Sequence, residues 1–500
     1  MSLSPELRRW QQRVEEAARG FGLDFCEIIF EVVDYERMNA VAAYGGFPTR
    51  FPHWRFGMAY NELSKGHAYG LRKIYEMVIN NEPCYAHLLE SNNLTDQKMV
   101  MAHVCAHCDF FRNNYAFAKT DRKMVDEMAN HATRIRKYMD RHGEAAVEEF
   151  IDRCLSVEDL IDPHAPFVRR RREPPRDSFE EEAAPPAPAR FESKDYMEEY
   201  VNPPEFLEEQ RRQLDEEEEQ RRRRFPEEPE RDVLLFLIEH GQLENWQRDI
   251  LSVIREESIY YASQWQTKMM NEGWATYWHS KILTGQGEAP PLLEDSELVH
   301  YADHHSGTVG GRPGVVNPYK LGLELFRNVE ERWNKGRFGK EYEECEDLVA
   351  RKNWDMQLGM GRQKIFEVRK LYNDVTFIDT FLTREFCEEQ GLFVFRYNRK
   401  TRRYEVAERD FEAVRRQLLF SITNAGRPIV RVLDGNCHNR GELLLEHQHE
   451  GVDLRLDYAR EALQRVQELW GRPVHLGTIV EGRPRRFSFD GHEHHETDAR

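Results

Sequence analysis

The sequence predicts a mainly α fold, in which a large helical part is joined to a small C-terminal α+β domain. Apolar residues recur at three- and four-residue spacings over 5–162 and again over 232–385, as they do on the buried face of a helix. From Leu392 the pattern changes to the alternation that is typical of strands. We therefore divide the chain into five stretches, namely 1–162, 163–231, 232–385, 386–490 and a frayed tail at 491–500.

The first stretch is expected to be helical almost throughout. Its one long interruption, residues 43–57, places glycines and prolines among five aromatic side chains. This composition predicts an ordered, packed loop.

The second stretch, 163–231, is a charged insertion rich in Arg, Glu and Pro. It cannot bury enough apolar surface to offset the entropy of ordering it, so we expect it to be mostly disordered, with a short helix near 204–224. Its basic and acidic runs alternate, which favours a solvated polyampholyte over a nucleic-acid-binding arm.

The third and fourth stretches carry the remaining elements. Helical patterning resumes at Asp232 and runs through Ser280. The C-terminal part predicts a hairpin at 393–397 and 403–406, helices at 411–422 and 458–470, and strands at 428–434, 443–445, 474–479 and 486–489.

Composition limits the class of function. A net charge of -18 would repel a polyphosphate, so no nucleic-acid partner is expected. The N-terminus is typical of an amphipathic helix rather than a signal peptide, and no segment reaches transmembrane length. Eight scattered cysteines fit a reducing cytoplasm.

Two motifs on separate helices indicate a metal site. His103 and His107 lie four residues apart, on one face of a helix and about 6 Å from each other. Glu272, within Asn271–Ala275, lies between small neighbours that let another helix approach closely. We expect these three side chains to bind a divalent ion, zinc or else iron or manganese, with His279 as fourth ligand or supporting partner. The alternative is a pair of core histidines that bind carbonyl or carboxylate groups.

The usual general base of a zinc peptidase is missing. In the H-E-x-x-H signature a glutamate follows the first histidine, and here Val104 takes that position. A base would have to come from elsewhere, and the candidate catalytic residues are Glu62, Asp109 and His304, with His279 as a further candidate.

Other histidine, glutamate and cysteine residues are also considered as site residues. His300 and His304 repeat the four-residue spacing beside Asp303, and they either cap the cleft or are ordinary surface residues. His53 lies within the aromatic loop and Glu62 shortly after it, and both are further candidates. Cys105 and Cys108 have C-x-x-C spacing, but a single mid-helix pair favours small buried hydrophobes over a four-cysteine zinc site.

Several motifs, in this order, closely resemble those of the SpoVR family, the stage V sporulation protein R-like proteins. They cover nearly the whole chain outside the charged insertion and are Tyr44–Pro48, Pro52–Gly57, Tyr75–Asn81, Met101–His103 with His107 and Asp109–Phe111, Asn271–Ala275 and Asn317–Tyr319. The resemblance implies a cytoplasmic bacterial protein linked to formation of the spore cortex, a modified peptidoglycan, or to a wider stress response. It also implies a serine protein kinase as partner.

A weaker similarity is to the gluzincin peptidases, whose His/His/Glu helices this arrangement resembles. Two hypotheses follow. The chain is either a metal-dependent hydrolase of an amide in a peptide or cell-wall precursor, or a non-catalytic adaptor whose metal or polar core only holds helices together. A nucleic-acid regulator is disfavoured by the acidic net charge.

Overall fold

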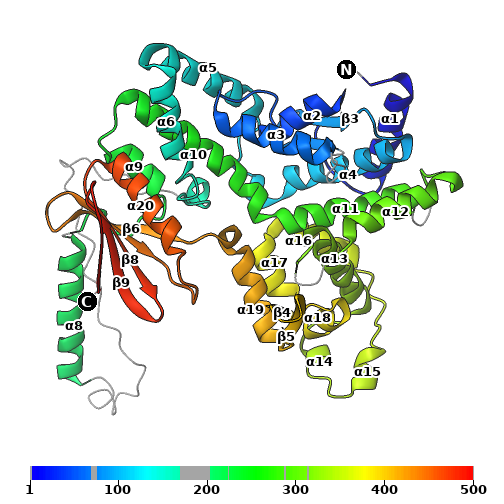
Figure 1. Ribbon diagram of the computed structural model, residues 1–500. Coiled ribbons are helices and arrows are strands. Elements are labelled where there is room, and N and C mark those ends of the chain that lie inside the picture. The colour runs from blue at the N-terminus through cyan, green and yellow to red at the C-terminus, as the bar shows by residue number, and fades with distance from the viewer. Residues whose placement is uncertain are drawn as a thin grey trace, which may run out of the picture. The chain divides into compact units, whose positions relative to one another are not determined.

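The computed structural model describes residues 3–68, 76–168, 203–222, 224–285, 289–311 and 315–498. It confirms a mainly helical protein with a small C-terminal sheet domain (Figure 1). Contacts group the chain into two compact units, one of residues 1–148 with 260–427 and one of 149–259 with 428–500. The boundaries of these two units differ from the domain boundaries that we drew from the sequence. The sequence-based boundaries remain predictions.

The first unit is built around two buried helices, α4 (Leu94–Asn113) and α11 (Lys268–Thr284). Every side chain of α4 from Thr95 to Phe111 is buried, since neighbouring elements cover the helix all round. The other helices of this unit are α1 (Pro5–Gly20), α2 (Tyr35–Ala43), α3 (Trp54–Ala68), α5 (Met124–His142), α12 (Leu298–Val309), α13 (Pro318–Lys335), α14 (Lys340–Glu343), α15 (Leu348–Lys352), α16 (Gly361–Leu371), α17 (Asp374–Phe381), α18 (Arg384–Gln390) and α19 (Phe411–Ile422).

Helix α11 lies unusually close to α13. A Cβ atom added at Gly273 would come within 2.4 Å of the carbonyl carbon of Gly322, so the two backbones touch where both helices carry glycine. The start of α11 is capped by another helix. The two carboxyl oxygens of Asp374, from α17, each accept a backbone N–H, from Met269 and Met270, at 2.8 Å. These contacts fix the position of α11.

The first unit also contains a three-stranded sheet, so the expectation of helix throughout 1–162 is wrong there. Strands β1 (Ile28–Val33), β2 (Glu76–Ile79) and β3 (Cys84–Leu89) take the order β1-β3-β2. β1 runs parallel to β3 and β2 antiparallel to it. The β-branched run of β1, which fits a buried pleated surface, explains the strand.

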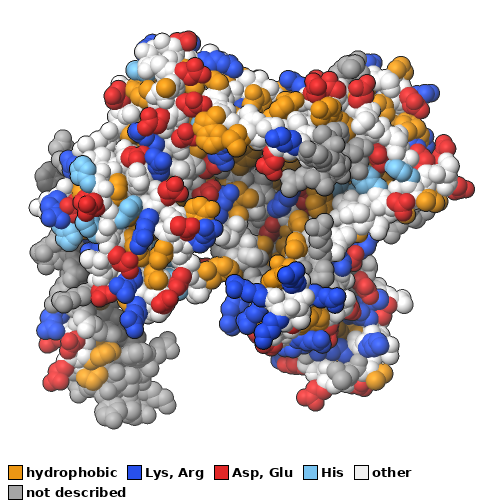
Figure 2. All heavy atoms as spheres, in the orientation of Figure 1, with side chains coloured by type: hydrophobic (Ala, Val, Ile, Leu, Met, Phe, Trp, Pro, Cys, Tyr) orange, Lys and Arg blue, Asp and Glu red, His pale blue; other side chains and the backbone are white. Residues whose placement is uncertain are grey.

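Two further features of this unit agree with the sequence. Phe47 and Phe51 of the aromatic loop are buried, as a packed loop requires. The predicted hairpin forms as β4 (Val394–Asn398) and β5 (Arg403–Glu408) and leads to α19, which has the predicted bounds. Basic side chains gather over this hairpin and α19 (Figure 2).

The second unit contains the larger sheet. Its strands β6 (Val430–Cys437), β7 (Glu442–His447), β8 (Val474–Val480), β9 (Arg483–Phe489) and β10 (His494–Asp498) take the order β10-β9-β8-β7-β6. β7 and β8 are parallel and are connected through α20 (Leu456–Trp470), which packs on β8 and β9. The expectation of a frayed tail is wrong, because β10 pairs antiparallel with β9 and its backbone hydrogen-bonds to the outer edge of that strand.

The remaining helices of this unit precede the sheet in sequence. α8 (Pro204–Arg222) matches the short helix predicted in the charged insertion, while the predicted disorder falls largely on 169–202, outside the described residues. α9 (Val233–His240) packs against β6. α6 (Glu144–Leu155) and α10 (Asn245–Gln266) each contribute residues to both units.

Candidate metal centre

Helices α4 and α11 bring together the three residues proposed from the sequence as metal ligands, His103, His107 and Glu272 (the His103 cluster). The Nε2 atom of each imidazole lies 3.5 Å from the same oxygen, Oε2 of Glu272. In a tetrahedral zinc site with bonds of about 2.0–2.1 Å, two ligand atoms lie about 3.4 Å apart. The observed spacing therefore fits three ligands of one divalent ion.

The His103 cluster is buried and its carboxylate is incompletely satisfied. The side chains of His103, His107 and Glu272 are 8%, 7% and 8% exposed. Oε2 of Glu272 has no hydrogen-bond partner among the described residues, whereas Oε1 lies 2.5 Å from Nζ of Lys268. A buried anionic oxygen without a donor is costly, so a cation between it and the two imidazoles would be stabilising.

A hydrogen bond from its ring orients the imidazole of His107. Nδ1 of His107 lies 2.9 Å from Oδ1 of Asn271, an oxygen that can only accept, so Nδ1 carries a proton. In the neutral ring, Nε2 then presents a lone pair towards Glu272, which is the tautomer a metal ligand needs.

His279 contacts His103 rather than joining the three ligand atoms. The two Nδ1 atoms lie 3.0 Å apart, and Nε2 of His279 lies 3.0 Å from Nδ1 of His305. This favours His279 as the supporting partner over a fourth ligand. Burial, together with the nearby His103, lowers the pKa of His279 well below its usual range and keeps the ring neutral.

Electrostatics keep Glu272 ionised. Burial alone would raise the pKa of this carboxyl, but the facing His103 and His107 hold it well below its usual range. Burial likewise opposes the charge on His107, yet the neighbouring Glu272 raises the pKa of that imidazole. The His103 cluster thus has the anionic carboxylate that a divalent ion needs.

Two residues beside the His103 cluster were not predicted from the sequence to belong to the site. The ring of Tyr319, at the start of α13, stacks on His103 with centroids 6.4 Å apart and an angle of 19°. Burial and the adjacent Glu272 raise the pKa of Tyr319, so its hydroxyl stays a hydrogen-bond donor. Tyr319 ends the Asn-Pro-Tyr motif, and Lys268 precedes Glu272 by one helical turn, so both had a signal in the sequence.

Asp109, a candidate base, is engaged elsewhere. Two residues along a helix turn the chain by about 200°, so Asp109 points away from His107. Its oxygens bind Nη1 of Arg369 at 2.9 Å, Nε1 of Trp274 at 2.8 Å and the backbone N–H of Asp24 at 2.8 Å. Burial raises the pKa of Asp109 to about 6 despite Arg369. This network joins α4, α11 and α16.

The other candidates lie at separate places. Glu62 is exposed on α3, and His53 is buried in the aromatic loop. His304 contacts Asp96 of α4, so the carboxylate beside this histidine pair is Asp96 instead of the neighbouring Asp303. The Cys105 and Cys108 thiols are fully buried, and burial raises the pKa of both, as expected for small core residues.

The fold and this site define a mainly helical protein with a buried cluster of two histidines and one glutamate on facing helices. Comparison with known proteins identifies the family. The sequence model described as SpoVR like protein matches residues 2–427, and the SpoVR-like C-terminal domain matches 428–481. The chain therefore belongs to the SpoVR family, and the boundary between the two matches coincides with a boundary between the two compact units.

A relative in Escherichia coli strain K12 covers nearly the same length. It is called "Uncharacterized protein YcgB" and is 29% identical over 485 residues, which are 93% of this chain and 90% of the relative. No solved structure matches the chain. Within the described residues, the helices are too short or too polar to cross a membrane.

Proposed function

We propose that this SpoVR-family protein binds a divalent metal ion through His103, His107 and Glu272. The observation that carries the proposal is Oε2 of Glu272, which is buried, has no hydrogen bond within the described part of the chain and lies 3.5 Å from both Nε2 atoms. Two imidazoles and one carboxylate suit zinc, and also iron or manganese. Three protein ligands leave a coordination position for water, as in catalytic zinc sites.

The chemistry that this site would support is metal-assisted hydrolysis of an amide, in a peptide or a cell-wall precursor. A bound divalent ion would lower the pKa of its water, and Tyr319 and Lys268 would supply hydrogen bonds next to it. The likeness to the gluzincin arrangement belongs to this proposal, with Val104 in place of the catalytic glutamate. Because Asp109 is held by Arg369, it is a poorer base than the sequence suggested.

Membership of the SpoVR family is the basis for a proposed biological role. We propose a role in the cytoplasm, in formation of the spore cortex or in a stress response, with a serine protein kinase as partner. These points rest on family membership.

A second candidate function is favoured by the burial of the His103 cluster. Its three side chains are at most 8% exposed, which leaves little surface for a substrate. In this alternative the ion only ties α4 to α11, and the protein is a non-catalytic adaptor that binds partners through other surfaces.

Elemental analysis of protein purified without chelators tests the metal centre. Wild type should carry close to one equivalent of metal at the His103 cluster, and a His103→Ala/His107→Ala/Glu272→Ala variant that still folds should lose that equivalent. His87→Ala is the matched control, because His87 is also buried in the first unit but lies on β3. Metal-free wild type would overturn the proposal.

The single variant His103→Ala separates the two functions. A folded variant without hydrolytic activity supports the hydrolase. A variant whose first unit melts far below wild type, when wild type shows no hydrolysis, supports the adaptor with a structural ion.

A further inference from the structure

A second group of metal-ligating side chains lies along the same face of α4. Asp96 precedes His103 by seven residues, so the two side chains lie on one face of the helix, two turns apart. Its partners, His300 and His304, lie one turn apart on α12. We propose that Asp96, His300 and His304 (the Asp96 cluster) form a second divalent cation site, open to solvent and independent of the first.

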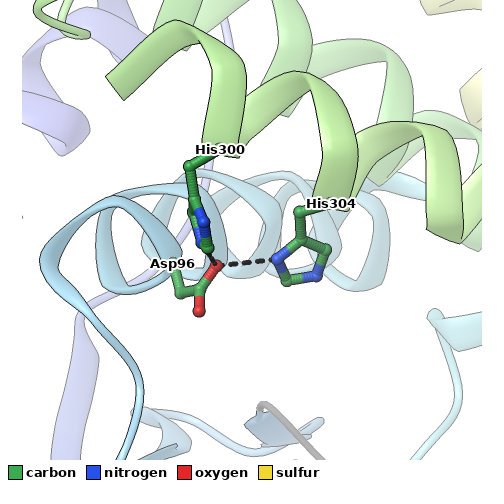
Figure 3. Close-up of side chains that lie close together, drawn as sticks. All are labelled: Asp96, His300 and His304. Atoms are coloured by element: carbon green, nitrogen blue, oxygen red, sulfur yellow. Dashed lines mark hydrogen bonds and ion pairs between the residues drawn. The ribbon is translucent and has the colours of Figure 1, made fainter. Parts of the chain in front are cut away.

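The three side chains converge on one atom. Oδ1 of Asp96 lies 2.7 Å from Nδ1 of His304 and 3.0 Å from Nε2 of His300, and both rings point at the carboxylate (Figure 3). Two imidazoles one helical turn apart and a carboxylate from a facing helix make the same donor set as the His103 cluster.

The hydrogen bonding of His300 is frustrated, which points to a cation. Oδ1 of Asn93 accepts the backbone N–H of Asp96 at 2.8 Å, so the amide nitrogen Nδ2 is the atom that faces Nε2 of His300, also at 2.8 Å. If Nε2 is protonated, its N–H opposes the N–H of Asn93. If it is unprotonated, its lone pair opposes the oxygen of Asp96 at 3.0 Å. A cation between Nε2 and Oδ1 would bind this lone pair and remove the second conflict, in exchange for the hydrogen bond from Asn93.

The Asp96 cluster is more accessible than the His103 cluster. The side chain of His300 is 48% exposed, whereas those of Asp96 and His304 are 6% and 12% exposed. Ligand atoms of one small ion lie about 3.4 Å apart, so binding requires an opening of about 0.4 Å between Asp96 and His300 and of about 0.7 Å between Asp96 and His304. The exposed His300 can move for the first, and a small shift of α12 relative to α4 would give the second. The ion would therefore exchange readily with solvent.

The site can be tested by titrating zinc into metal-free protein and measuring the number of bound ions by isothermal titration calorimetry. Every protein carries His492→Ala/His494→Ala/His495→Ala, because the exposed histidines near the C-terminus would bind zinc on their own. Wild type in this background should bind two equivalents, and His300→Ala/His304→Ala should bind one. Asp303→Asn, an exposed neighbour on α12, is the matched control and should retain both.

Two further variants make the outcome decisive. The His103→Ala/His107→Ala/Glu272→Ala variant should keep one equivalent, so failure of the first site does not mask the second. Asp96→Asn keeps the size of the side chain and should also lose one equivalent, which covers the case in which the double histidine variant does not fold. Equal stoichiometry in wild type and Asp96→Asn would overturn the proposal.

Discussion

The contact between α11 and α13 gives a prediction that can be worked out from the structure. In Gly273→Ala, the new Cβ would lie 2.4 Å from the carbonyl carbon of Gly322 and 2.7 Å from the backbone nitrogen of Leu323. Ordinary contact begins at 3.4 Å, so the two helices must separate by about 1 Å. Both partners are backbone atoms, which cannot rotate away as a side chain would.

The expected cost combines two opposing effects. Overpacking costs about 1–3 kcal/mol, while replacing glycine by alanine within a helix returns about 0.5–1 kcal/mol. We therefore expect Gly273→Ala to lower the free energy of unfolding by up to about 2.5 kcal/mol, with a central value of about 1 kcal/mol. Because Glu272 is the adjacent residue, the shift of α11 should also weaken zinc binding at the His103 cluster.

A matched control separates packing from helix propensity. Among the residues that the structure describes, no atom lies within 4 Å of a Cβ added at Gly57 on α3, so Gly57→Ala should stabilise the first unit by about 0.5–1 kcal/mol. Urea denaturation followed by tryptophan fluorescence and circular dichroism measures both variants. If Gly273→Ala proves as stable as Gly57→Ala, the close packing of α11 on α13 is refuted.

Three more predictions concern buried carboxylates and the ion. Burial raises the pKa of Asp374 from 3.8 to about 7, so the folded state keeps a proton that the unfolded chain loses. The contribution of this group to stability should fall as pH rises from about 4 to 7, and Asp374→Asn should remove that dependence from urea midpoints measured across this range. Asp109→Ala leaves Arg369 buried without its partner and should cost about 3–5 kcal/mol in the same assay, whereas a cost below about 1 kcal/mol would contradict the ion pair. A chelator should lower the thermal midpoint of wild type by more than that of the His103→Ala/His107→Ala/Glu272→Ala variant, which keeps the proposed Asp96 cluster, and an equal shift in both would argue against a metal at the His103 cluster.

Local signals in the sequence predicted local structure well. The hairpin β4–β5 and helix α19 follow from alternation and three- to four-residue spacing, each of which is read within a dozen residues. Strand β1 was missed because it pairs with β3 across more than 50 positions, from Ile28 to Cys84. The hairpin of β2 and β3 was missed although its loop, from Asn80 to Pro83, is short. Their short apolar runs resemble buried helix in sequence.

The same distinction explains which parts of the site were predicted. The four-residue spacing of His103 and His107 is enough to place both on one face of a helix, and Glu272 lies in a distinctive motif. These three residues could therefore be predicted. The carboxylate partner of His304 was not predictable, because Asp96 lies 208 positions away and Asp303 offered a nearer acid. The ion pair of Asp109 with Arg369 was also not predictable, because the two residues are 260 positions apart.

The first unit is assembled from two stretches of chain with residues 149–259 between them. During synthesis, α4 leaves the ribosome long before α11, because His103 and His279 are 176 positions apart. At about 5–20 residues per second this delay is about 10–35 s. Throughout that interval a helix destined to be covered on every side has no partner, so the nascent chain should depend on chaperones. The His103 cluster cannot capture an ion until α11 has docked.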